Sequence, residues 1–425
     1  MTGWWQWGGR GGRGGRPRVA RCLAAALLVL TASGGCGVDG APGARPGDGT
    51  VQRLLDRWAA AVRDHDEAAF LAAVDPGSPA YRQRQRQVFE SLAAVPLASW
   101  EYRLVRTGGF APEPGDGRRV AAQAELRYRL DGYDTAPVTT GVRLTLVERD
   151  GRWYVAAEDP HQAGRQLWQQ GRVTAVRGRH SLVLGVGQDE DRLKAVADLA
   201  DAAVPAVTDA WRGGQEWPGR VVVEMPESLE RMAALLDAPA ANYRGIAAVT
   251  TGEVGGSGKA PADRIVVNPE AYGVLGDLGR RVVLTHETTH VATRALTSRA
   301  TPLWLSEGFA DWAAYRGSGR TARQAAPELA RAVASGYLPK NLPADADFGF
   351  TGEAGRLAGA YEEGWLACRM IAEQWGEAKL VAFYRAVGGH SRRSGAVESA
   401  LRAELGVSKA EFTDRWRAYV KREFR

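Results

Sequence analysis

Two histidines and a glutamate in one short run offer the clearest chemistry in this chain. The run is His286-Glu287-Thr288-Thr289-His290, and only six histidines occur in all 425 residues. Histidines four residues apart on a helix project from one face, so both imidazoles reach a single metal ion. Glu287 then points toward the open side of that metal, where a carboxylate can take a proton from a bound water. The run predicts a catalytic site with one metal ion, and neutral imidazoles suit Zn²⁺.

The elements around this run must hold the ligands firmly. Five apolar residues flank the two histidines and give the predicted helix a buried side: Val282, Val283, Leu284, Val291 and Leu296. A catalytic zinc takes three protein ligands and leaves one position for water, so a third His, Asp or Glu is expected from a neighbouring element. The alternative interpretation is a pair of histidines with a purely structural role on a core helix.

A second helix is expected directly after the first. Thr301 and Pro302 have the pattern of a capping hydroxyl followed by proline at the first helical position. Glu307 lies inside this helix, and Asp311 follows four residues later on the same face. A ligating histidine usually donates its other N–H to a carboxylate, which fixes its tautomer. Asp311 is expected to be that acceptor.

Together these residues resemble a known family. The pattern His286-Glu287-x-x-His290, with Glu307 and Asp311 in the run 304–312, is similar to the gluzincin metallopeptidases of the thermolysin-like and M1-like kinds. The resemblance implies that His286, His290 and Glu307 bind one zinc ion, that Glu287 is the general base, and that a peptide bond is hydrolysed. It covers 165–425 and implies two lobes, a mixed sheet with the active-site helix and then a helical lobe.

The resemblance leaves the substrate and one catalytic group open. Gluzincins stabilise the oxyanion with a Tyr or His of the helical lobe, and Tyr361 is the candidate here, with His390 and Tyr243 as alternatives. The sequence has no Gly-x-Met-Glu-Asn run before the zinc helix, the feature with which M1 aminopeptidases hold a free amine. Endopeptidase action is therefore favoured. The alternative is a cell-surface protein that binds a partner with a peptidase-like domain but cuts weakly or not at all.

The first 36 residues have the order of an export signal. Arginines precede an apolar run at 23–30, and small residues at 32–35 precede Cys36. The apolar run is too short to be a permanent membrane helix. The arrangement resembles the processing site of bacterial lipoproteins, which implies a lipid on Cys36 and a membrane-anchored protein that faces outside. Ser33 departs from that pattern, which usually has leucine there, and the alternative is ordinary cleavage and secretion.

Charge and cysteine content exclude other classes of protein. Five arginines precede Asp39, the first acidic residue, and without them the net charge of +6 falls to +1. The excess of positive charge lies in the leader, so no nucleic acid partner is expected. An RNA-binding tail is the alternative interpretation of the Arg-Gly-Gly repeats at 10–16. Cys368 is the one cysteine after Cys36, so no internal disulfide framework is expected.

The chain after the leader divides into a linker and a first domain. Residues 37–49 are rich in Gly and Pro and are expected to be a flexible linker. Within 50–160, periodicity predicts two helices and then four strands: helices around 51–62 and 70–74, and strands at 98–106, 122–131, 140–148 and 152–157. This α+β order resembles the NTF2-like (SnoaL-like) cone fold, which implies a folded spacer or recognition module.

The second domain, 165–425, begins with alternating strands and helices. Strands are expected near 173–186, 220–225, 246–250 and 264–268, and helices at 193–207 and 227–236, with a largely helical chain from 280 onward. The glycine-rich loop 252–259 resembles a phosphate-binding loop. It has Glu253 where that pattern needs glycine and Ala260 where it needs Ser or Thr. A mobile connection beside an edge strand is the interpretation preferred.

Overall fold

A computed structural model of the chain describes residues 47–252, 263–349 and 354–425. The predicted export signal 1–36 with Cys36, most of the predicted linker 37–49 and most of the loop 252–259 lie outside the described residues. Among the described helices, none is long and apolar enough to cross a membrane.

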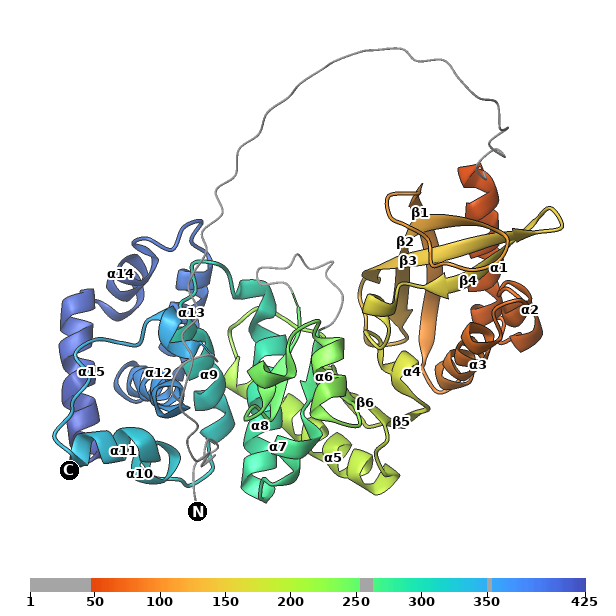
Figure 1. Ribbon diagram of the computed structural model, residues 1–425. Helices are drawn as coiled ribbons and strands as arrows, with labels where there is room; N and C mark the ends of the chain where they lie inside the picture. Colours follow the sequence, from red (N-terminus) through yellow and green to blue (C-terminus); the bar gives the residue numbers. More distant parts are fainter. Residues whose placement is uncertain (1–46, 253–262, 350–353) are drawn as a thin grey trace, which may run out of the picture.

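The first part of the structure, here called the N-terminal module (residues 48–170), packs helices against a four-stranded antiparallel sheet (Figure 1). Its elements are α1 (Asp48–Arg63), α2 (Glu67–Ala72), α3 (Pro79–Leu92), β1 (Leu97–Thr107), β2 (Arg118–Leu130), β3 (Val138–Arg149), β4 (Arg152–Glu158), η1 (Pro160–Gln162) and α4 (Leu167–Gln170). Alternate residues of β2 from Ala122 to Leu130 are buried, as the sequence pattern predicts. A tight turn joins β3 to β4, and its residues Asp150 and Gly151 both have positive φ.

Two predictions for this region are wrong. α1 begins at Asp48, so the last two residues predicted for the linker are helical; an acidic residue in the first turn is favourable at a helix N-terminus. No helix is predicted between 76 and 98, yet α3 occupies 79–92. This helix buries Tyr81 and the polar Gln85, so its sequence lacks the apolar period that would reveal it.

The second part is built on a five-stranded sheet with the order β5-β6-β7-β9-β8. β6, β7 and β9 are parallel, and the outer strands β5 and β8 run antiparallel to their neighbours. Its elements are β5 (Val173–Arg177), β6 (Ser181–Val186), α5 (Glu190–Ala210), β7 (Val221–Met225), α6 (Leu229–Leu235), η2 (Ala240–Tyr243), β8 (Ala248–Thr250), β9 (Arg264–Val267), α7 (Pro269–Gly273) and α8 (Asp277–Thr293). The mixed sheet followed by a helix is the predicted order.

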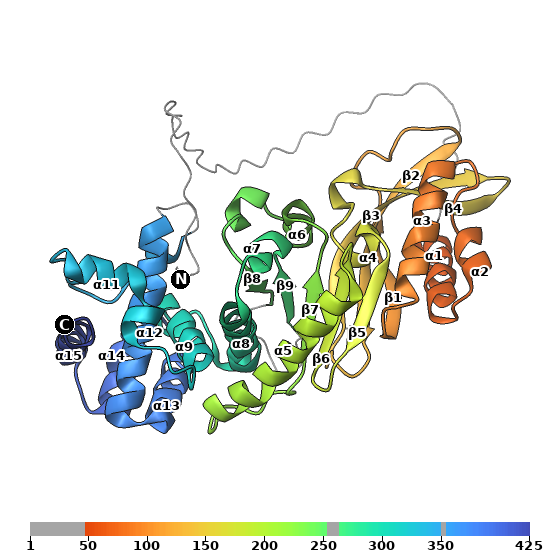
Figure 2. The same ribbon diagram turned by 90° about the horizontal axis from the view of Figure 1, so that it is seen from below.

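This central sheet lies between two layers (Figures 1 and 2). On one face, Leu182 and Val222 join the hydrophobic core that contains Trp100 of the N-terminal module. On the other face, Val183 packs in a second core with Leu284 of α8. Alternate side chains of a strand point to opposite faces, so strands covered on both sides are largely apolar. Every residue of β6 and β7 is buried, and Ser181 and Glu224 are the polar ones.

A buried ion pair joins the N-terminal module to the central sheet. Both terminal nitrogens of Arg264 on β9 donate to the Asp134 carboxylate at 2.8 Å. The two residues are 7% and 9% exposed, and Glu224 of β7 lies 3.9 Å from the guanidinium. Because the pair is buried, the two parts are held in one arrangement by charge as well as by apolar contact.

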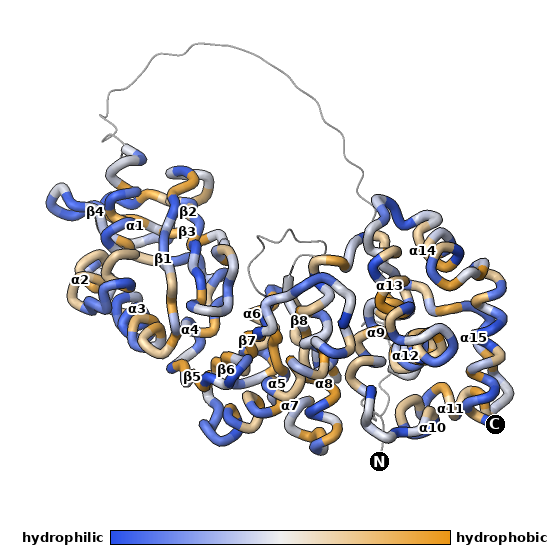
Figure 3. Tube along the Cα trace, turned by 180° about the vertical axis from the view of Figure 1, so that it is seen from behind, coloured by the Kyte–Doolittle hydropathy of each residue, from blue (hydrophilic) through white to orange (hydrophobic). Residues whose placement is uncertain are grey.

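The remaining chain is a helical part beside α5 and α8. Its elements are η3 (Arg294–Leu296), α9 (Leu303–Tyr315), α10 (Ala322–Ala325), α11 (Pro327–Ala334), η4 (Asp345–Phe348), α12 (Ala354–Trp375), α13 (Glu377–Gly388), α14 (Ala396–Ala400), the π-helical segment η5 (Leu401–Leu405) and α15 (Lys409–Glu423). These helices share one core that Val207 and Trp211 at the end of α5 also enter. The outer helix α15 is mostly hydrophilic along its length (Figure 3). The protein is thus of the predicted α+β class.

Candidate metal centre

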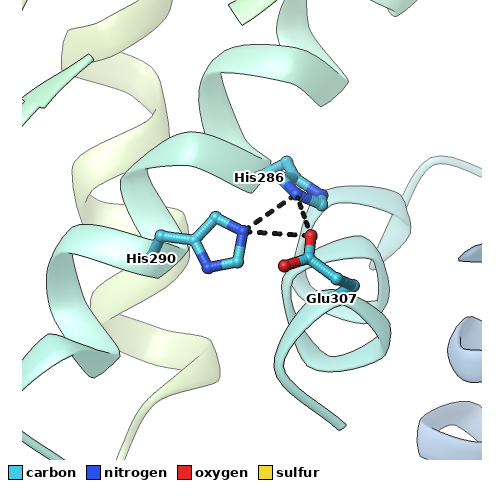
Figure 4. A group of neighbouring side chains, drawn as sticks. All are labelled: His286, His290 and Glu307. Atoms are coloured by element: carbon cyan, nitrogen blue, oxygen red, sulfur yellow. Dashed lines mark hydrogen bonds and ion pairs between the residues drawn. The ribbon is translucent and has the colours of Figure 1, made fainter. Parts of the chain in front are cut away.

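The two histidines project from the second half of α8 (Figure 4). Leu284 and Thr288 on the same helix are completely buried, so the helix is fixed in the core on its other side. The side chains of His286 and His290 keep 12% and 16% of their surface exposed. The two histidines are four residues apart on a helix whose other side is buried, so both imidazoles project into the same open space.

Glu307 reaches this space from α9. Here one sequence prediction is wrong: Thr301 does not cap α9, and Pro302 is the N-cap residue rather than the first helical residue. The first helical N–H, that of Leu303, instead donates to Oδ1 of Asp345 at 2.9 Å. Arg393 holds that carboxylate with two contacts of 2.6 Å. The start of the helix that carries Glu307 is therefore fixed by Asp345 and Arg393, which follow Leu303 in the sequence by 42 and 90 positions.

A close crossing of α9 and α12 places the helical part around the centre. A Cβ atom built on Gly308 would clash with the carbonyl oxygen of Gly364, and one on Gly364 would lie 2.7 Å from the carbonyl oxygen of Trp304. Only glycine permits backbones this close. Glu307 is the neighbour of Gly308, and Tyr361 lies one turn before Gly364 on α12. The crossing therefore sets the distance between these two functional side chains.

The three predicted ligand atoms converge. Nε2 of His286 lies 3.0 Å from Nε2 of His290, and Oε2 of Glu307 lies 3.2 and 3.3 Å from these two nitrogens. A tetrahedral zinc with bonds of about 2.0 to 2.1 Å needs ligand atoms roughly 3.3 Å apart. Within the described residues, this is the one group of three His, Cys, Asp or Glu side chains arranged to hold a metal ion. The donor set and its spacing fit zinc.

Asp311 lies behind His286. Its Oδ1 is 2.8 Å from Nδ1 of His286, and a carboxylate can only accept, so Nδ1 carries the hydrogen and Nε2 is free to bind a metal. Burial lowers the pKa of His286, but Asp311 and Glu307 outweigh burial and hold that pKa well above its ordinary value. Burial raises the pKa of Glu307, and the two histidines reverse the effect and hold it far below the ordinary value. The carboxylates and the imidazoles of the centre therefore strongly favour each other's charged forms.

Glu287 is held beside the ligands by a residue that the sequence analysis does not single out. The hydroxyl of Thr250 on β8 donates to Oε2 of Glu287 at 2.6 Å and lies 3.1 Å from its backbone carbonyl oxygen. Glu287 is 7% exposed, so the carboxylate has one fixed position. Thr250 and Glu287 are 37 residues apart, and no local pattern announces their contact.

Tyr361 is the one of the three candidate oxyanion donors that the structure brings to the centre. Its ring centroid lies 6.2 Å from that of His286, and its hydroxyl hydrogen-bonds to Glu307. Burial, reinforced by Glu307 and Asp311, raises the pKa of Tyr361 well above 10, so the hydroxyl stays protonated and can donate. His390 follows α13 and Tyr243 ends η2; neither lines the cavities around the centre.

Two cavities adjoin the centre. One, here called the groove, has a volume of about 490 Å³ and includes His286, His290, Glu307 and Tyr361 in its lining. The other, here called the side pocket, has a volume of about 110 Å³ and lies on the Asp311 side. Its walls are largely apolar: Val282, Val283, Ala325, Ala358 and Trp365. Both cavities include Glu287, so a molecule that spans them passes the centre.

The structure resembles solved M1 zinc metallopeptidases at a low level of similarity. A mutant of a two-domain M1 zinc metallopeptidase bound to L-arginine gives a TM-score of 0.35 at 12% identity, covering 75% of this chain and 93% of that chain. A mutant enzyme from Deinococcus radiodurans bound to a Tyr-Ser-Ala substrate gives 0.33 at 13%, and one bound to L-tryptophan gives 0.33 at 14%, with the same coverage. The sequence matches no protein-family profile and no curated protein.

Proposed function

We propose that this protein is a zinc-dependent peptide hydrolase. The observation that carries the proposal is the convergence of His286, His290 and Glu307 to within 3.0 to 3.3 Å of one another, with Glu287 fixed beside them. Three ligands leave one position of a tetrahedral zinc for water, which is the arrangement of a catalytic rather than a structural site. The hydrogen bond between Asp311 and His286 supports the same assignment, because it presents Nε2 to the metal.

The chemistry divides among the residues of the centre. Zinc held by the three ligands would lower the pKa of a bound water to about 7 and would polarise a carbonyl group. Glu287 takes the proton and later delivers it to the leaving amine. Thr250 keeps that carboxylate in place through its 2.6 Å hydrogen bond. Tyr361 donates its hydroxyl hydrogen to the oxyanion, because its pKa keeps it protonated.

The substrate in this proposal is an extended peptide that pairs with β8. This strand is at the edge of the central sheet, and Ala248 lines both the groove and the side pocket. An extended peptide adds readily to such an edge, and antiparallel pairing is the more stable form. β8 runs from the side pocket toward Thr250 in the groove. The N-terminal side of an antiparallel substrate then lies in the groove, and an apolar side chain after the scissile bond enters the side pocket.

The charges of the groove support endopeptidase action within this proposal. Among the described residues of its lining, Asp345 is the one carboxylate besides Glu287 and Glu307, and Arg393 is paired with it. Arg294 and Arg299 line the groove as well. Arg294 is itself paired with Asp263 at 2.7 Å. A free ammonium group at the start of a substrate therefore finds no unpaired carboxylate there apart from those of the centre, whereas the interior of a longer peptide brings no charge.

The proposal includes a location outside the cytoplasm, supported by the order of arginines, apolar run and small residues before Cys36. We expect a lipid on Cys36 to anchor the protein to the membrane. Substituting Cys36→Ser should move the protein from the membrane fraction to the medium, and the mass of the mature N-terminal peptide should show the acyl groups. An uncleaved leader on a cytoplasmic protein would contradict this part.

Substitution of Glu287 tests the function. The purified protein should contain one zinc per chain, and Glu287→Ala should keep that zinc while chelator-sensitive cleavage of a peptide library falls by about 100-fold or more, because the base is not a ligand. His290→Ala or Glu307→Ala should lose zinc instead. The control is Glu216→Ala, an exposed glutamate away from the centre. Zinc without any chelator-sensitive cleavage in the wild type would favour a binding protein over an enzyme.

A further inference from the structure

A further cavity, separate from the groove and the side pocket, lies in the N-terminal module. It has a volume of about 470 Å³, is formed by α3, the end of β4, η1 and α4, and shares no lining residue with the groove or the side pocket. Cavities of roughly 300 to 1,000 Å³ are the usual size of small-ligand sites. Tyr81, Gln85 and Trp168 in its wall are 5%, 4% and 3% exposed, so the cavity is set into the core of the module.

A carboxylate that forms no close ion pair lies in this cavity. Glu158 at the end of β4 accepts hydrogen bonds from the Tyr81 hydroxyl at 3.3 Å, the Gln85 amide at 3.4 Å and the Gln169 amide at 3.2 Å. All three donors are neutral and distant, and no Lys or Arg of the described residues lies within 4 Å of the Glu158 carboxylate, although Arg84 is near enough to lower its pKa. Burial raises the pKa of Glu158 above its ordinary value. A partly buried carboxylate in this state gains from a positive ligand.

The same cavity offers a cation and an apolar wall. Arg84 lines it from α3, with its guanidinium 5.7 Å from the centre of the Tyr81 ring, and makes no ion pair with a described residue. Trp168 and Val88 supply apolar surface. An anion, a cation and an apolar wall around one space form the complement of a small molecule that carries an ammonium group, a carboxylate and an apolar body.

We propose that this cavity binds a free amino acid or a dipeptide, with its ammonium group on Glu158 and its carboxylate toward Arg84. An ammonium group has three N–H donors, which suits a carboxylate that now receives only long bonds from neutral groups. The apolar part of the ligand packs on Trp168. Such molecules are released by peptide hydrolysis, but binding here requires neither zinc nor turnover, so the proposal stands or falls independently of the proposed function.

Ligand-induced thermal shifts of the full-length protein test the site. The probes are the common L-amino acids and a mixed set of dipeptides, followed for the best probe by its decarboxylated amine and its deaminated acid. The zwitterion should bind more tightly than either single-charge analogue. Glu158→Gln should weaken its binding by about 10- to 100-fold, since a hydrogen-bonded charge pair is lost. Arg84→Gln should weaken the zwitterion but not the amine. Glu90→Gln, an exposed change on the same helix, is the control.

Glu158→Gln removes a partly buried charge and keeps the shape of the side chain, so the variant should fold at least as stably as the wild type while the ligand-induced shift decreases. The proposal is overturned if no amino acid or dipeptide shifts the transition. It is equally overturned if the deaminated acid binds as well as the zwitterion, or if Glu158→Gln leaves binding unchanged.

Discussion

Asp311 is predicted to act on zinc through His286 rather than by direct contact. Its hydrogen bond of 2.8 Å to Nδ1 fixes the tautomer and makes Nε2 a better donor. Asp311→Asn should therefore weaken zinc binding by about 10-fold and Asp311→Ala by up to about 100-fold, without unfolding the protein. Competition with a chromophoric chelator measures the affinity, and the exposed Asp198→Asn serves as the matched change. Equal affinity in all variants would show that the contact has no role in metal binding.

Glu363 makes the stability of the fold depend on pH. It is 2% exposed, and burial raises its pKa from 4.5 to about 7 despite Arg356 at 3.1 Å. The unfolded chain releases this proton at lower pH than the folded chain, so stability decreases as pH rises from 4.5 to 7. The loss is at most about 3 kcal/mol.

Replacing Glu363 with glutamine should remove that share of the pH dependence, because the amide resembles the protonated acid and does not ionise. Urea unfolding of wild type and Glu363→Gln, at a mildly acidic and a mildly alkaline pH, measures the difference. The variant should gain stability relative to wild type only at the higher pH. Glu362, whose pKa burial raises to about 8, contributes to the remaining slope. An unchanged slope in the variant would exclude the assignment.

The crossing of α9 and α12 is the most sensitive point among the helices. Gly308→Ala brings a Cβ atom against the backbone of Gly364, so the helices must separate. The cost of this separation outweighs the gain of about 1 kcal/mol in helix propensity, and we expect the free energy of unfolding to fall by about 2 kcal/mol. Zinc binding should be roughly 10-fold weaker, since Glu307 moves with its neighbour. Gly355→Ala, where α12 has open space, should stabilise instead. Equal effects of the two substitutions would contradict the packing argument.

Elements with a regular apolar period could be predicted from the sequence, and elements stabilised by distant polar contacts could not. β2 was accessible because its side chains alternate between core and solvent. α3 buries Tyr81 and Gln85 around a cavity, so its sequence has the composition of a surface segment. The start of α9 depends on Asp345, which no pattern within one helix can reveal.

The same distinction between local and distant contacts applies to the residues of the metal centre. The four-residue spacing of His286 and His290 is local and follows from helix geometry alone. Thr250 meets Glu287 only because β8 lies along α8 in the folded protein. The convergence of Glu307 with the histidines likewise requires the packing of α8 on α9, so the sequence could suggest this ligand only through a family resemblance.

The N-terminal module and the central sheet should unfold together. They share one hydrophobic core and the buried pair Asp134–Arg264. Asp134→Ala leaves the Arg264 charge buried without its main partner and should cost about 3 to 5 kcal/mol, in a single urea transition followed by fluorescence and circular dichroism. The exposed Asp131→Ala is the control, three positions away. Replacing both partners, Asp134→Leu with Arg264→Met, should recover most of the loss.

Two separate transitions in the wild type, or an undisturbed Asp134→Ala variant, would show that the module is an independent unit. One transition would mean that the module cannot be removed without exposing the apolar face of β6 and β7. Zinc binding and the cavity at Glu158 would then belong to one cooperative structure.

The glycine crossing also constrains how this sequence can change over generations. Substitution at Gly308 or Gly364 is blocked by backbone rather than by another side chain, so no compensating mutation at a neighbouring position can make room. A lineage that lost hydrolysis could exchange Glu287 without effect on activity, whereas loss of either glycine would still reduce the stability of the helical part. Among sequences that descend from this one, the two glycines should therefore be retained more often than the histidines. They should also be the better marker of common ancestry.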